Sequence, residues 1–124
     1  MTQEDKDLLL KDLCCRIPYG VKVQSHRYEN DIETVETLYN IDSDGYMYTL
    51  ECDTLKSITR PYLFPLSSMT EEQKEEFNSL MVKDSYDILY YTPKAFDFLY
   101  ENHIDFRGLI PMGLANDATN LNIH

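Results

Sequence analysis

Residues 33–52 read ETVETLYNIDSDGYMYTLEC, and the fold class depends on how this stretch folds. Apolar and β-branched residues recur at every second position in each half, namely Val35, Thr37, Tyr39 and Ile41, then Tyr46, Tyr48, Leu50 and Cys52. Such a period, with this residue content, favours β-strands. The DSDG between the halves is typical turn sequence, in which Gly45 supplies positive φ. The stretch therefore predicts a β-hairpin.

The first half of this stretch also fits a helix. Ile32, Val35, Leu38 and Tyr39 have the spacing of an apolar helical stripe. Residues 31–41 are therefore compatible with either a strand or a helix, and the sequence leaves both open.

The turn also matches the spacing of a calcium-binding loop. An EF-hand loop places oxygen ligands around a sharp turn at a glycine. Asn40, Asp42, Asp44, Tyr46 (through its carbonyl) and Glu51 stand at the ligand positions, with Gly45 at the turn. An EF-hand needs a helix on each side, whereas residues 46–50 are strand formers. We therefore expect the hairpin, and calcium binding through residues 40–51 is the alternative.

Helix starts are indicated at three points by a capping residue and its partner: Thr2 with Asp5, Thr70 with Gln73, and Thr92 before Pro93. The first helix should end at Pro18 and Gly20. Its buried face is predicted to be Leu10, Leu13, Cys14 and Ile17, widened by Leu9.

These elements predict an α+β fold, with a small antiparallel sheet of three to five strands and about three helices packed on it. A chain of 124 residues has the size of one domain. We place this domain at residues 1–113. Residues 114–124, LANDATNLNIH, have few apolar anchors and are predicted to form a loosely ordered tail.

The chain is acidic, with a formal net charge of −11. This charge disfavours binding to a nucleic-acid backbone or an anionic membrane, since both require Lys and Arg. It suits solubility, a cation or a basic protein partner. Between Arg27 and Lys56 there is no basic residue, yet the segment holds Glu29, Asp31, Glu33, Glu36, Asp42, Asp44, Glu51 and Asp53.

Cysteine usage favours a reduced compartment. The chain has three cysteines, of which Cys14 and Cys15 are adjacent in the first predicted helix, and this is no disulfide framework. The acidic start MTQEDKDLLL does not have the pattern of a signal peptide, and no stretch is apolar enough for a membrane span. We expect a cytoplasmic protein without a cofactor.

Catalytic signals are weak. His103, Asp105 and Arg107 alternate at the end of the third predicted helix, where a histidine commonly caps the helix. Nucleophile elbows, phosphate loops and metalloprotease motifs are absent from the sequence. The expectation is that the protein is not an enzyme.

Three blocks carry a resemblance to a known family: MTQEDKDLLLKDLCCRIPYGV (1–21), RPYLFPLSSMTEEQKEEF (60–77) and FDFLYENHIDFRGLIPMGLA (96–115). In order and content they resemble a family of small uncharacterised proteins of gut Bacteroidetes and their phages and mobile elements. The blocks cover roughly half of the chain, and the acidic segment lies outside them. The resemblance implies no activity.

Together these observations predict a non-catalytic interaction module, an accessory protein of a phage or mobile element. It would bind a protein partner, for which a basic surface is suited, through an acidic and Tyr-rich surface. The candidate residues are Glu29, Asp31, Glu33, Glu36, Asp42, Asp44, Tyr46 and Tyr48.

Overall fold

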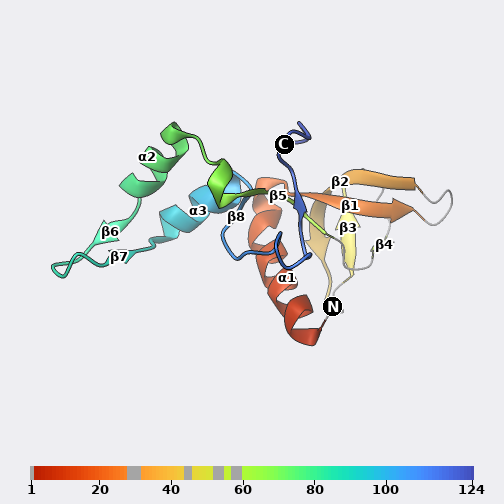
Figure 1. Cartoon of the computed structure of the whole chain (residues 1–124). Coiled ribbons are helices and arrows are strands. Elements are labelled where there is room, and N and C mark those ends of the chain that lie inside the picture. Colours follow the sequence, from red (N-terminus) through yellow and green to blue (C-terminus); the bar gives the residue numbers. More distant parts are fainter. Residues whose placement is uncertain (1, 28–31, 44–45, 52–54, 57–59) are drawn as a thin grey trace.

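The chain has the α+β fold that the sequence predicts (Figure 1). The structure is a computed structural model, which describes residues 2–27, 32–43, 46–51, 55–56 and 60–124. Its elements in chain order are α1 (Gln3–Arg16), η1 (Ile17–Tyr19), β1 (Lys22–Arg27), β2 (Ile32–Ile41), β3 (Met47–Thr49), β4 (Leu55–Lys56), β5 (Tyr62–Pro65), η2 (Leu66–Ser68), α2 (Glu71–Ser79), β6 (Val82–Lys83), β7 (Leu89–Tyr90), α3 (Pro93–Glu101), β8 (Ile104–Asp105) and β9 (Asn116–Asp117).

The first sheet is antiparallel and has the order β1-β2-β3-β4. Residues 31–41 fit a strand or a helix in sequence, and of these residues 32–41 form strand β2. Its register with β1 runs from Lys22 opposite Thr37 to Arg27 opposite Ile32. A register shift between Leu38 and Asn40 interrupts the pairing of β2 with β3. The predicted hairpin is therefore confirmed.

The second sheet is parallel, which the sequence did not indicate. Strand β5 lies between β8 and β9, and both neighbours run parallel to it. The predicted loose tail is wrong at this point, because β9 belongs to it and pairs with β5. Leu114, Ala115 and Ala118 are buried there. Two of these residues are alanines, whose small side chains pack closely without giving a strong apolar signal.

All three predicted helix caps are present. Thr2 and Asp5 form a capping box, Thr70 and Gln73 form another, and the hydroxyl of Thr92 accepts a hydrogen bond from the Ala95 N–H. The buried face of α1 differs from the predicted one. It consists of Leu9, Asp12, Leu13 and Arg16, whereas Cys14 is exposed. Asp12 and Arg16 can occupy this face because they are one turn apart and bond to each other.

The main core joins α1 to the first sheet, β5 and the residues after Arg107, and its buried members are Leu9, Leu13, Val21, Val23, Leu38, Met47, Leu63, Leu109, Leu114 and Ala115. A second cluster joins α3 to α2 through Phe98, Leu99 and Ile104 with Phe64, Met69, Phe77, Leu80 and Phe106. Beyond this cluster, the β6–β7 hairpin projects away from the body, on the side opposite the first sheet (Figure 1).

Candidate functional site

The loop between β2 and β3 is a hairpin turn. The Asp42 N–H donates to the Tyr46 carbonyl at 3.0 Å, and the Tyr46 N–H donates to the Asp42 carboxylate at 3.1 Å. Strands, rather than the helices of an EF-hand, lie on both sides. Asp44 and Gly45 lie outside the described residues.

Glu51, the last candidate calcium ligand, binds elsewhere. Its carboxylate accepts hydrogen bonds from the Thr37 N–H at 2.6 Å and the Thr37 hydroxyl at 2.7 Å. These hydrogen bonds outweigh partial desolvation, and the pKa of Glu51 lies below its ordinary value. Among the described residues, no group of three or more His, Cys, Asp or Glu side chains is arranged to hold a metal ion.

The predicted acidic surface differs from expectation at Glu36, which is buried and therefore cannot face a partner. Its carboxylate accepts hydrogen bonds from Thr49 at 3.1 Å and Thr34 at 3.0 Å. The alternation of β2 explains this burial, since Glu36 and Leu38 share the inner face. The opposite face exposes Val35 and Tyr39.

Other members of that surface have mixed positions. Tyr46 is exposed, and Tyr48 is half-buried and donates to the Asp42 carboxylate at 3.3 Å. Glu29, Asp31 and Asp44, together with the side chain of Glu33, lie outside the described part of the structure. The structure thus brings together Asp42, Tyr46 and Tyr48.

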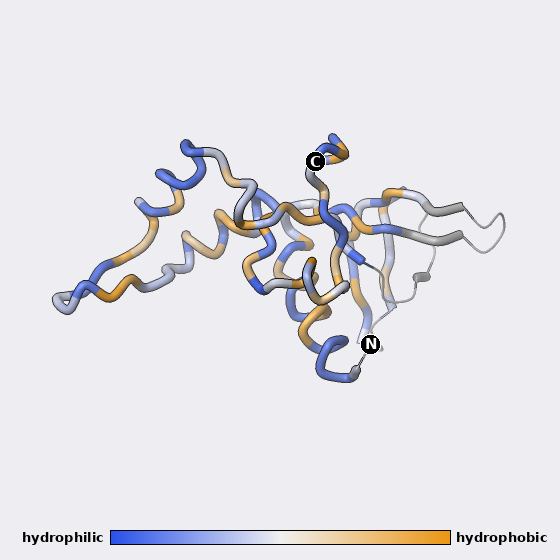
Figure 2. The backbone as a smooth tube through the Cα atoms, in the orientation of Figure 1, coloured by the Kyte–Doolittle hydropathy of each residue, from blue (hydrophilic) through white to orange (hydrophobic). Residues whose placement is uncertain are grey.

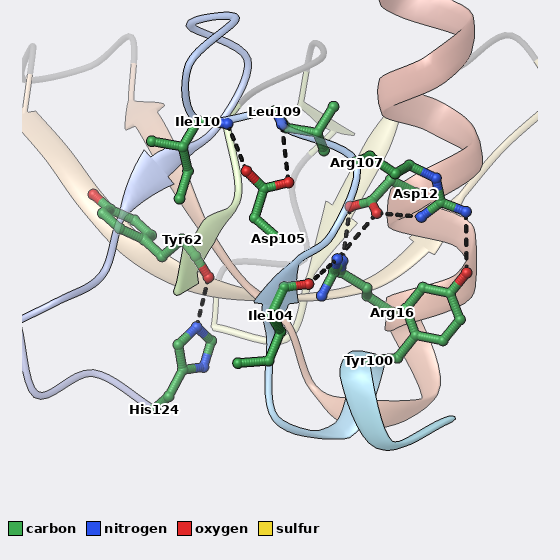
Figure 3. A network of polar contacts seen from close by, with 10 residues as sticks. All are labelled: Asp12, Arg16, Tyr62, Tyr100, Ile104, Asp105, Arg107, Leu109, Ile110 and His124. Atoms are coloured by element: carbon green, nitrogen blue, oxygen red, sulfur yellow. Dashed lines mark hydrogen bonds and ion pairs between the residues drawn. The ribbon is translucent and has the colours of Figure 1, made fainter. Parts of the chain in front are cut away.

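His103, Asp105 and Arg107 alternate in sequence, but each has different partners, and Figure 3 shows those of Asp105 and Arg107. Asp105 is buried and accepts the N–H groups of Leu109 at 2.9 Å and Ile110 at 2.8 Å. Arg107 contacts the Asp12 carboxylate and the Tyr100 hydroxyl. These contacts fix the turn after β8 and tie it to α1 and α3.

His103 lines a pocket of about 460 Å³. Its ring stacks on that of His124 with centroids 3.7 Å apart, and the His124 Nε2 lies 2.7 Å from the Tyr62 carbonyl oxygen. Burial, helped by the neighbouring His124 and Arg16, lowers the pKa of His103 from 6.5 to about 4. The remaining lining residues are Phe64, Ser68, Gln73, Glu101, Asn102, Ile104, Thr119 and Asn120.

The strongest candidate for a binding surface is the β6–β7 hairpin. We call residues 82–91 the hairpin arm. Large apolar or aromatic side chains along the arm are each between 49% and 83% exposed: Val82, Tyr86, Ile88, Leu89, Tyr90 and Tyr91. Figure 2 shows a hydrophobic stretch within this projecting segment. Contiguous exposed apolar side chains on a protein surface commonly mark interaction sites.

Hydrogen bonds to one carboxylate shape the turn of the arm. Asp84 accepts the N–H groups of Tyr86 at 2.8 Å and Ile88 at 3.0 Å, and the Tyr90 hydroxyl at 3.0 Å. These donors, with Ile88 first, lower the pKa of Asp84 below its ordinary value. Asp87 adopts φ +63° to complete the turn. The arm therefore has a defined backbone, although its side chains face solvent.

The base of the arm is fixed to the two helices beside it. The Thr92 hydroxyl, which caps α3, also donates to the Leu80 carbonyl at 2.6 Å, so one side chain joins the two ends of the arm. The Tyr91 ring contacts Phe77 of α2 and Phe96 of α3, with centroids 5.8 and 5.2 Å apart. Aromatic pairs at such distances are favourable.

The part of the chain around the arm is acidic. Between Glu71 and Glu101 there are eight Asp and Glu residues against three Lys, a net charge of −5. The exposed members on α2 are Glu71, Glu72, Glu75 and Glu76. The apolar arm is thus accompanied by carboxylates.

Sequence reasoning missed the arm because SYDILYY (85–91) fits a loop or a short strand, and neither interpretation indicates that its side chains are exposed. Two features of the sequence could have indicated it. Four large apolar or aromatic residues, Ile88 to Tyr91, follow the turn-forming residues Asp84–Asp87, and few neighbouring residues are available to cover both faces of such a strand. Exposure itself depends on tertiary packing.

No helix within the described residues combines the length and the apolar character needed to cross a membrane.

Comparison of the chain with protein-family models, with curated proteins and with solved structures gave no match.

Proposed function

We propose that this protein is a non-catalytic protein-binding module and that the hairpin arm is its contact surface. The observation that supports this proposal is the exposure of Val82, Tyr86, Ile88, Leu89, Tyr90 and Tyr91 on one projecting hairpin. Tyrosine is enriched in the centres of protein interfaces, because it contributes a large contact area and a hydrogen-bonding tip.

The ordered turn gives further support. A surface that is already in its binding conformation loses less conformational entropy on association. The hydrogen bonds to Asp84 hold the turn without any partner. The first sheet, on which the sequence predicted the contact surface, is less well supported as a contact surface because Glu36 faces inward. The role as an accessory protein of a phage or mobile element is part of the proposal and rests on the family resemblance alone.

Site-specific photocrosslinking tests the proposal. A photoreactive amino acid is placed at Tyr86 or Ile88 in the arm, and at Tyr46 or Leu50 on the first sheet as exposed controls. The full chain is produced in the cells that carry it. We expect one discrete adduct from the arm positions and none from the sheet positions.

The partner that the crosslink identifies is then purified on its own, and its binding to the unmodified chain is measured by calorimetry. Tyr86→Ser combined with Ile88→Ser should weaken binding at least tenfold, about 1.4 kcal/mol. The control pair Tyr46→Ser and Leu50→Ser should bind like the wild type. Loss of binding only in the control pair would move the contact surface to the first sheet and refute the assignment to the arm.

A further inference from the structure

The arm ends in a sheet edge that no described strand covers. Strands β6 and β7 form a two-stranded sheet, with Val82 opposite Tyr90 and Lys83 opposite Leu89. Two-stranded hairpins are marginally stable in water, and a third strand is the usual remedy. An open edge is a ready template for pairing with another chain.

The hydrogen-bond pattern shows which backbone groups face this edge. The Asp84 N–H donates to the Ile88 carbonyl at 3.1 Å, and the Ile88 N–H donates back to the Asp84 carboxylate, so these two residues stand at the hydrogen-bonded position that closes the hairpin. Hydrogen-bonded and non-hydrogen-bonded pairs alternate in an antiparallel ladder. The next pair, Lys83 and Leu89, is therefore non-hydrogen-bonded. The N–H and C=O of Leu89 consequently point away from β6, toward the open edge.

The two edges of the hairpin differ in chemistry. The β6 edge carries Lys83, and a lysine on an edge strand discourages pairing. The β7 side has no charged residue from Ile88 to Tyr91. The side chains of Leu89 and Tyr90, the two residues of β7, point to opposite faces of the hairpin, and all four side chains from Ile88 to Tyr91 are about half exposed. A flat partner surface would cover one face, whereas an added strand brings side chains to both.

Electrostatics selects the partner. The segment from Glu71 to Glu101 has a net charge of −5 and the whole chain −11, so a second copy of the chain would be repelled. A segment rich in Lys and Arg would be attracted to the α2 glutamates, which lie in the same projecting part of the molecule (Figure 1).

We propose that the arm binds an extended, basic segment of its protein partner, which pairs as a third strand with the open edge of β7. This inference rests on the proposed function and specifies its partner. Main-chain hydrogen bonds to Leu89 would set the position of the added strand, and side chains on its two faces would cover Leu89 and Tyr90.

The probe is a fluorescent peptide in which Lys or Arg alternates with Val or Tyr, and its binding to the full chain is followed by anisotropy. We expect saturable binding at one site. Three matched peptides serve as controls. One has Glu in place of Lys and Arg, one has the same composition in an order that breaks the alternation, and one has N-methylated amides along one edge. Each should bind at least tenfold more weakly.

Variants then distinguish backbone pairing from side-chain contact. Leu89→Pro removes the outward N–H and leaves the bonds to β6, a position at which an edge strand tolerates proline. It should weaken binding at least tenfold, whereas Leu89→Ala should weaken it less. Lys83→Pro removes the corresponding N–H from the other edge and should leave binding unchanged. Circular dichroism and thermal melting establish that each variant is folded.

The other outcomes each refute the inference. If Leu89→Pro and Lys83→Pro both bind like the wild type while Tyr86→Ser does not, recognition is by side chains and strand addition is wrong. If sedimentation shows a dimer that Leu89→Pro abolishes, the occupant is a second copy. If the basic peptide does not bind, the basic strand is excluded. None of these removes the proposed function, which fails only if crosslinking and calorimetry show no contact at the arm.

Discussion

The Asp12 carboxylate is shared by two arginines that are far apart in sequence. Its Oδ2 lies 2.7 Å from the Arg16 Nε in the same helix, and its Oδ1 lies 2.5 Å from the Nη1 of Arg107, 95 residues later. Asp12 and Arg16 are both fully buried. Arg16 also donates to the Ile104 carbonyl at 2.6 Å, so this one group connects α1 to β8 and the turn that follows it.

Asp12→Ala should be among the most damaging single substitutions in the chain. It leaves two guanidinium groups without their carboxylate, and an unpaired buried charge typically costs about 3–5 kcal/mol. The free energy of unfolding from urea titration measures this loss. Asp7→Ala, on the exposed side of the same helix, is the control and should change stability by about 0.5 kcal/mol or less. A loss below about 1 kcal/mol for Asp12→Ala would contradict the assigned role of the pair.

Asp105→Ala should lower the free energy of unfolding by about 1–3 kcal/mol, because the N–H groups of Leu109 and Ile110 lose their acceptor. Asp105→Asn should also be destabilising, because the amide oxygen can accept only one of the two N–H groups and the amide NH2 would face the other, which is a donor. Urea unfolding of both variants measures the losses. Wild-type stability in Asp105→Asn would show that the turn does not require two acceptor oxygens.

Thr92→Ala should loosen the arm more than the body. The hydroxyl both caps α3 and donates to the Leu80 carbonyl, and loss of a helix cap alone costs about 1 kcal/mol. Hydrogen exchange should become faster in residues 81–91 and stay unchanged in β1 and β2. Thr92→Ser keeps both bonds and should exchange like the wild type. Uniform acceleration across the chain would argue against a local role.

The stability of the wild type should decline on acidification in a window set by His103. Its pKa is about 4 in the folded chain and 6.5 ordinarily. Between pH 6.5 and about 4, the His103 imidazole is therefore protonated in the unfolded chain but remains neutral in the folded chain. The free energy of unfolding falls as the pH falls through this range. Above pH 6.5 this contribution is fully retained.

His103→Asn isolates this effect, because asparagine tolerates the φ of +58° at this position. Chemical unfolding at a series of pH values should give a shallower decline between pH 6.5 and 4 for the variant. His124, whose pKa is also lowered by burial, continues to titrate in both proteins. Parallel curves for the two proteins would exclude His103 as the source.

Calcium should leave the melting temperature unchanged at millimolar concentration, because strands flank the loop and Glu51 is bound to Thr37. Glu51→Gln should lower the melting temperature equally with and without calcium. Calorimetry and thermal melts provide the measurement. A stoichiometric heat that Glu51→Gln abolishes would restore the calcium-binding alternative.

Local signals in the sequence predicted local structure well. The caps at Thr2, Thr70 and Thr92 and the turn near Asp42 each depend on residues within a few positions of one another. Whether residues 31–41 form a strand or a helix could not be decided from these residues alone, since their apolar pattern fits both the period of a strand and that of a helix. Pairing with β1 decides it, and the same pairing turns Glu36 inward.

Long-range features escaped prediction for the same reason. Nothing near Asp12 indicates Arg107, and nothing near Ala118 indicates that β5 lies beside it. The candidate site was missed in a different way. An apolar run such as Ile88–Tyr91 looks the same in sequence whether it is covered or projecting, because coverage depends on how the rest of the chain packs.

The place of β5 between β8 and β9 has a consequence for synthesis. Both strands that pair with β5 come later in the chain, and β9 follows it by about fifty residues. While the ribosome is still translating residues 66–103, β5 has neither neighbour and Asp12 lacks Arg107. We therefore expect the nascent chain to complete its body only after Asn116 has emerged, with the β1–β2 hairpin free to form first.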